Sequence, residues 1–236
     1  MKLMNGFLGN GPAAALCLIL LAAVLPAETF TYNEVEGNLK VTHTIVVSPA
    51  SPGYRVELES RRSGGGSVRQ IFRTAADLST LTWSFSDPGR QMELAARFQA
   101  GEIVLSGNFR GKRVDKKFAA SGAPWNQLFQ VGLRSFVLAG ATAYQFRSIG
   151  TEGPGELKMG KFSVTRSGEE NMVLAGKEIA AVHLRISLSG LLSVFWHGDY
   201  WYRKADGRFL RYRGKNRSGG PVAVSELVEE QDTMAK

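Results

Sequence analysis

Cysteine is scarce in this sequence. The 236 residues contain a single one, Cys17, which lies in an apolar run near the N-terminus. Without a second cysteine the chain cannot form an intramolecular disulfide, so a packed core has to hold the fold together. The residues that follow position 27 are numerous enough for one domain with a sizeable core.

Histidine is also scarce, and the sequence has no metal or cofactor motif. The three histidines, His43, His183 and His197, match the spacing of no metal site. The glycine run at 64–66 lacks the lysine and the serine or threonine that follow in a phosphate-binding loop. We therefore predict neither a metal nor a cofactor. His43 falls on the apolar side of its strand, where we expect a hydrogen-bonded core histidine.

Long apolar runs are limited to the N-terminus. Ala13–Leu25 is apolar throughout and shorter than a membrane-spanning helix, Lys2 precedes it, and Ala27 is small. This pattern predicts a signal peptide at 1–27, with an uncleaved anchor as the alternative. Leu16 before Cys17 does not fit a lipoprotein signal. We expect the mature protein in the periplasm of a double-membraned bacterium, with full secretion as the other outcome.

Positive charge is in excess. Lysine and arginine number 29 against 21 acidic residues, which gives a net charge of +8. An exported basic protein is suited to an anionic envelope surface, although the charge could serve solubility alone. Export argues against nucleic acid as a partner.

Apolar and polar residues alternate along most of the chain, which is typical of antiparallel strands with one buried face. Val182–Leu188 is the clearest case, with an apolar side chain at every second position. We also expect a turn at Ser167-Gly168. The predicted strands are 39–47, 54–60, 68–73, 81–86, 92–98, 103–109, 144–149, 157–166, 171–175 and 182–188.

One segment has a helical period. Pro124–Ala139 places apolar side chains on one helical face, with Pro124 suited to its start and Gly140 to its end. The predicted fold is mainly β: a strongly twisted antiparallel sheet forming a barrel or half-barrel, with one main amphipathic helix against it.

The stretch Gly190–Gly214 predicts a β-hairpin. Its aromatic runs flank Lys204–Gly207, and Asp-Gly is a strong hairpin signal. We assign 28–222 to a single β domain. The acidic segment 223–236 lacks a sheet pattern and is predicted to be a mobile C-terminal tail.

The hairpin and the helix together suggest a ligand site. Aromatic side chains would line a trough in the sheet, and arginines at its rim would pair with an anionic head. The ligand would be a lipid or another amphiphile; the alternative is a dry core in which side chains fill the trough. The candidate residues are Trp125, Phe129, Trp196, Tyr200, Tyr202, Arg203, Arg211 and Arg213.

Catalytic motifs are missing from the sequence. His197 and Asp199 are the one pair suited to acid–base chemistry, and no nucleophile signature accompanies them. We therefore expect a non-enzymatic binding or scaffolding protein of the cell envelope. The alternative is a hydrolase of envelope polymers that uses this pair.

The C-terminal half resembles a family of exported bacterial proteins, domain-of-unknown-function family 3108. The similar motifs are Leu133–Phe136, Gly176–Glu178 with the strand after it, and Phe195–Trp201 with Asp206–Arg208. The resemblance covers Pro124–Gly214. It implies an envelope location and a strongly twisted β-barrel or half-barrel with a helix, and it implies no known activity or catalytic residue.

Overall fold

The computed structural model describes residues 26–120, 122–152, 155–190, 196–216 and 219–233, so the predicted signal peptide falls almost entirely outside the described residues. Strands dominate the described chain. They are β1 (Ala27–Glu36), β2 (Leu39–Ala50), β3 (Gly53–Arg62), β4 (Ser67–Thr74), β5 (Thr80–Asp87), β6 (Met92–Gln99), β7 (Glu102–Phe109), β8 (Lys112–Ala119), β9 (Ala143–Glu152), β10 (Glu156–Leu174), β11 (Lys177–Leu188), β12 (His197–Arg203), β13 (Phe209–Lys215) and β14 (Val222–Thr233).

All of these strands belong to one 14-stranded sheet in the order β8-β7-β6-β5-β4-β3-β2-β1-β14-β13-β12-β11-β10-β9. Neighbouring strands are antiparallel, and β1 pairs with β14. The sheet is therefore a continuous meander that is joined at the two ends of the described chain. Its free edges, β8 and β9, are consecutive in the sequence.

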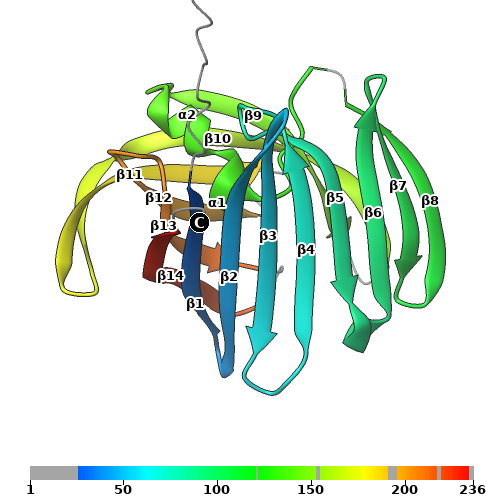
Figure 1. Cartoon of the computed structure of the whole chain (residues 1–236), viewed down its shortest axis with the longest axis horizontal. Coiled ribbons are helices and arrows are strands. Elements are labelled where there is room, and N and C mark those ends of the chain that lie inside the picture. Colours follow the sequence, from blue (N-terminus) through cyan, green and yellow to red (C-terminus); the bar gives the residue numbers. More distant parts are fainter. Residues whose placement is uncertain (1–25, 121, 153–154, 191–195, 217–218, 234–236) are drawn as a thin grey trace, which may run out of the picture.

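The sheet curves around its own core. In Figure 1, β1 to β8 stand side by side at the front, and β9 to β11 run across behind them, with the helices at the top between the two halves. The largest fully buried side chains come from both halves and include Phe72, Phe146, Tyr202 and Phe209. The predicted mainly antiparallel, barrel-like fold is confirmed, and the barrel is not closed, since β8 and β9 do not pair within the described residues.

The gap between the free edges is crossed by side chains and by one extended segment. The backbone of Pro124 and Asn126 bonds to Arg147 on β9, which covers part of that edge. Lys116 on β8 forms an ion pair with Glu156 at 2.8 Å. Covered edges of this kind leave fewer backbone groups free for pairing with another chain.

The prediction of one helix over Pro124–Ala139 is wrong in its extent. Two short helices are present, α1 (Phe129–Gly132) and α2 (Arg134–Leu138), separated at Leu133. The bonds to Arg147 hold the start of the segment extended, so helix cannot begin at Pro124. The apolar stripe is nevertheless buried as its period indicates, with Leu133 fully inaccessible.

The prediction of a mobile tail over 223–236 is wrong for the residues described. Strand β14 occupies Val222–Thr233 and pairs with β1 and β13. Its inward positions include Ala223 and Ser225, which are small or polar, so the usual apolar alternation is weak. Pairing with β1 and β13 therefore orders this segment, although its sequence pattern does not indicate a strand.

Two local predictions had different outcomes. The hairpin is confirmed: β12 and β13 pair across a turn in which Gly207 has a φ of 69°. The turn at Ser167-Gly168 is wrong, because β10 passes through it as one strand. A register shift between Arg166 and Gly168 marks a bulge there.

Candidate functional site

An interior cavity of about 330 Å³, partly open to solvent, lies between the two halves of the sheet. Side chains from β1 to β4 line one side, and side chains from α1, β9, β13 and β14 line the other. The apolar part of the lining is Ile45, Leu58, Leu128, Phe129, Ile149 and Phe209. The polar part is Tyr32, His43, Ser60, Gln70, Gln127, Gln130, Ser148 and Ser225.

No lysine, arginine, aspartate or glutamate is among the described residues that line this cavity. Some of the polar groups already have partners. Gln127 accepts from the Ile149 N–H at 2.8 Å and donates to the Ile149 carbonyl at 2.8 Å, in the manner of a neighbouring strand. The Tyr32 hydroxyl donates to the Phe209 carbonyl at 3.2 Å. The cavity thus combines apolar walls with neutral hydrogen-bonding groups.

A chain of three polar side chains reaches the cavity from β1, β2 and β3. The Nδ1 atom of His43 lies 2.8 Å from the Ser60 hydroxyl, and its Nε2 atom lies 3.4 Å from the carboxylate of Glu34. The strand register explains the contact, because His43 lies opposite Ser60. The prediction of a hydrogen bond at His43 is confirmed, but the side chain is 22% exposed and therefore half-buried, not part of the core.

Glu34 is ionised more readily than an ordinary glutamate. Burial alone would raise its pKa, but contacts from His43 and the Asn216 amide outweigh burial and hold the pKa below the usual value. Asn216 donates to Glu34 at 2.9 Å. A carboxylate that stays charged beside His43 favours a proton on the Nε2 atom that faces it.

The predicted aromatic residues cluster in the core. Phe129 packs against Tyr200 at 6.2 Å between ring centroids, and its carbonyl accepts from the Tyr202 hydroxyl at 2.9 Å. Trp196 packs edge-on against Phe162, which in turn contacts Phe129. Tyr200 and Tyr202 are buried, and burial raises the pKa of both, so they act as neutral groups.

These aromatics and the cavity overlap at one residue. Phe129 lines the cavity, whereas Trp125, Trp196, Tyr200 and Tyr202 are not among its lining residues. Trp125 is buried and donates from Nε1 to Gln127 at 2.9 Å. Trp125 therefore contacts the lining residue Gln127 and does not line the cavity itself.

Two of the three predicted arginines, Arg211 and Arg213, lie on the outer face of the sheet. Arg203 lies at the end of β12, and its guanidinium reaches Glu230, which lies opposite the inward-facing Phe30 on β1. Arg203 binds Glu230 at 2.8 Å, Arg211 forms an ion pair with Glu226, and Arg213 is exposed on the outer face. The structure does not bring Arg211 and Arg213 to the surface that carries the aromatic residues.

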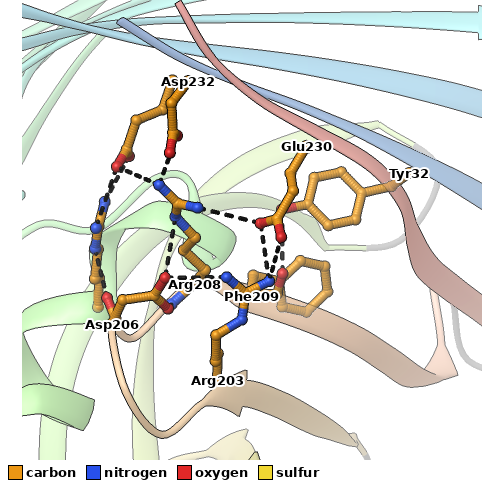
Figure 2. Close-up of polar contacts among 9 residues, drawn as sticks. Tyr32, Arg203, Asp206, Arg208, Phe209, Glu230 and Asp232 are labelled. Carbon is orange, nitrogen blue, oxygen red and sulfur yellow. Dashed lines mark hydrogen bonds and ion pairs between the residues drawn. The ribbon is translucent and has the colours of Figure 1, made fainter. Parts of the chain in front are cut away.

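The strand predicted to be a tail supplies the carboxylates that neutralise the hairpin. Figure 2 shows Arg208 between Asp206, Glu230 and Asp232, with Arg203 also reaching Glu230. We call the residues of this arrangement the ion cluster. Its members are Glu28, Arg134, Arg203, Asp206, Arg208, Glu230 and Asp232.

The ion cluster ties α2 and the hairpin turn to the β1–β14 pair. Glu28 accepts from Arg134 at 2.7 Å and from Arg208 at 2.9 Å. Burial opposes ionisation of Glu28, but the two guanidinium groups outweigh it and lower the pKa. Burial also opposes the charge on Arg208, and the bond to Glu28 with nearby carboxylates raises its pKa above the ordinary value. The ion cluster therefore holds α2, the hairpin turn, β1 and β14 together.

Asp199, which we predicted to pair with His197, contacts His183 instead. Asp199 bonds to His183 at 3.0 Å across the β11–β12 pair, and His197 is exposed. The His183 ring stacks on Trp201 with 4.7 Å between ring centroids, and the Trp201 indole donates to Glu170. Sequence reasoning missed the His183–Asp199 contact because it depends on the register between two strands.

Metal sites and membrane-spanning helices are both absent from the described residues. These residues hold no group of three or more histidine, cysteine, aspartate or glutamate side chains placed to bind a metal ion. None of their helices is long and apolar enough to cross a membrane.

The fold has a counterpart among solved structures. A beta-barrel-like protein of domain-of-unknown-function family 1849 from Brucella abortus matches with a TM-score of 0.60 and 10% sequence identity, over 89% of this chain and 98% of that chain. The hypothetical lipoprotein YmcC of Escherichia coli K12 matches with a TM-score of 0.40 and 11% identity, over 89% of each chain. The first match supports the barrel-like fold and says nothing of a ligand.

The sequence comparisons assign the chain to no family. No protein-family model matches the chain, and no curated protein matches it. The resemblance to family 3108 is therefore not confirmed, and the similarity that is shown is one of fold.

Proposed function

We propose that this protein is an exported, non-catalytic binding protein of the cell envelope that takes an amphipathic ligand into its interior cavity. The observation that carries the proposal is the mixed lining of the 330 Å³ cavity. Binding cavities in proteins combine apolar walls with a few placed polar groups and start at about 300 Å³. The uncharged lining suits a ligand with a neutral polar group.

This ligand differs from the one that the sequence suggests. An anionic head would need the hairpin arginines, but Arg203 is paired with Glu230, and Arg211 is paired with Glu226 on the outer face. Within the cavity, the side chains of Gln70, Gln130 and Ser225 can offer hydrogen bonds to an amide, ester or hydroxyl group. The apolar part of the ligand would contact Ile45, Leu58 and Phe209.

Native mass spectrometry of protein purified without detergent from its own envelope tests the proposal. We expect a bound molecule in the wild type and its loss from Ser225→Leu, because the larger side chain fills the cavity. Ser67→Leu is the matched control at an exposed position and should retain the ligand. A clean apoprotein whose melting temperature does not respond to added lipids would overturn the proposal.

A hydrolase is the second candidate, because the Glu34–His43–Ser60 chain ends at the same cavity. His43 could take the Ser60 proton through Nδ1 while the serine oxygen attacks an ester carbonyl and Glu34 stabilises the imidazolium. His43 would return the proton to the departing alcohol, and water would then hydrolyse the acyl-serine. Cleavage of a nitrophenyl ester that Ser60→Ala abolishes would replace the binding role with this one.

A further inference from the structure

A second hollow, of about 580 Å³, lies on the outer face of β3 to β7. These strands form the front of the molecule in Figure 1. The floor is made of small or short side chains, among them Ser84, Ala95 and Ser106, and the rim carries Arg55, Arg73 and Arg97. We call this feature the arginine hollow.

Strand register brings its arginines into one row. Arg55 lies opposite Arg73, Arg73 lies opposite Thr82, and Thr82 lies opposite Arg97. Adjacent strands are about 4.8 Å apart, so the backbones of Arg73 and Arg97 are separated by about 10 Å across the sheet. Two side chains as long as arginine can meet over Thr82 at that separation. Lys117 extends the row by way of Val104.

Neutralising groups are scarce around the hollow. Its described lining contains no carboxylate. The nearby Glu57 binds Arg55 at 2.9 Å and Arg69 at 2.8 Å. Among the described residues, neither Arg73 nor Arg97 has an ion pair, and both are exposed. Like charges directly opposite one another destabilise a sheet, and of the facing Arg55 and Arg73 only Arg55 has a counter-charge, from Glu57.

We propose that the arginine hollow binds a phosphoryl group. A guanidinium presents paired N–H donors that match two phosphate oxygens, so Arg73 and Arg97 could grip one group from opposite sides. The hydroxyl group of Thr82 lies between them in the strand register, and the hydroxyl groups of Ser84 and Ser106 also line the hollow as further donors. A phosphate needs several donors that no acid already occupies, and Arg73 and Arg97 have no ion pair among the described residues.

The inference does not depend on the interior cavity. The hollow opens on the outer face, whereas the cavity lining on the same strands comes from inward residues such as Leu58 and Gln70. The phosphoryl group could belong to a free anion or to a lipid headgroup at the membrane surface. A protein with both sites would hold an envelope surface with one face and a ligand inside.

Calorimetric titration with pyrophosphate tests the site, and sedimentation with vesicles of phosphatidylglycerol or phosphatidylcholine separates the two sources. For Arg73→Gln/Arg97→Gln we expect affinity to fall by about tenfold or more, since each bond to a charged group contributes on the order of a tenfold factor. The matched control is Lys177→Gln/Arg185→Gln, which removes the same charge from exposed positions on β11. The control should bind as the wild type does.

The outcomes are separable. Loss of pyrophosphate binding in the hollow variant alone supports a site for free anions as well as headgroups. Loss of phosphatidylglycerol binding alone, with no pyrophosphate binding by the wild type, supports a headgroup site. Equal loss in both variants would show a net-charge effect and overturn the inference, as would a wild type that binds neither probe. The interior ligand is detected separately by mass, so the two proposals fail independently.

Discussion

The ion cluster and the arginine hollow are two arginine-rich regions with opposite surroundings. In the ion cluster, Arg208 is 13% exposed and lies within 3.2 Å of carboxylates from β1, the hairpin turn and β14. In the arginine hollow, Arg73 and Arg97 are exposed and no carboxylate is among the described lining residues. Arginine therefore stabilises the fold in the ion cluster, whereas Arg73 and Arg97 in the arginine hollow are accessible to a ligand.

The comparison shows that the density of basic residues along a sequence is a poor guide to exposed positive potential. The hairpin contains the densest run, and the acidic strand β14 neutralises much of it. The hollow draws its arginines from β3, β4 and β6, and their concentration becomes visible only when the strands are paired. Three predictions, in order of decreasing effect, test the difference.

The largest effect is expected from Arg208→Met. The methionine keeps an apolar stem near Phe30 but leaves Glu28 and Asp232 without their shared partner. Loss of one member of a partly buried ion network should lower the free energy of unfolding by about 2 to 3 kcal/mol, measured by urea denaturation. Arg97→Met should change it by less than about 0.5 kcal/mol, as is usual for a surface position. Equal effects at the two positions would contradict the distinction.

The fold was largely predictable because its strands have one apolar face. Most of the alternating segments correspond to strands, and Asp206-Gly207 correctly indicated a hairpin. The exceptions have polar residues at inward positions. Strand β14 has Ser225 directed inward, and β1 has Glu34 near the cavity. Their alternation is therefore weak, and pairing with neighbouring strands has to hold these two segments extended.

The sites were less predictable than the fold, because they depend on strand register. The aromatic cluster and the burial of the Pro124–Ala139 stripe follow from residue type, but the face on which Arg211 lies relative to the cavity does not. His43 and Ser60 lie on different strands and meet only when β2 and β3 are paired in the observed register. The outward arginines of β3, β4 and β6 predict the arginine hollow only when the order and register of these strands are known.

An intermediate effect is expected from acid. The pKa of Glu28 is below its ordinary value of 4.5, so its stabilising contribution is complete above that pH and is lost as the pH falls through the lower folded-state pKa. Between neutral and acidic pH, wild type should lose on the order of 1 kcal/mol that Glu28→Gln does not lose, after allowance for solvent screening. Urea midpoints at a series of pH values measure the difference.

The control for the acid experiment is Glu57→Gln beside the hollow. Hydrogen bonds from Arg69 and Arg55 lower the pKa of Glu57 as well, but its side chain is 35% exposed and solvent screens the pairs. Its pH dependence should therefore follow that of the wild type more closely. If Glu57→Gln and Glu28→Gln changed the profile equally, the ion cluster would have no special part in stability.

The smallest effect is expected from Arg73→Gln in the absence of a bound anion, and its sign is the informative part. The substitution removes the repulsion between Arg73 and Arg55, which face each other across β3 and β4. Stability should rise by a few tenths of a kcal/mol in about 0.01 M salt, where the screening length is about 30 Å, and the gain should vanish in about 1 M salt. Thermal unfolding at the two salt concentrations measures it. Pyrophosphate should reverse the order, because it stabilises the wild type and leaves the variant unchanged. A variant that is less stable than the wild type at low salt without added anion would show that Arg73 serves the fold, as Arg208 does.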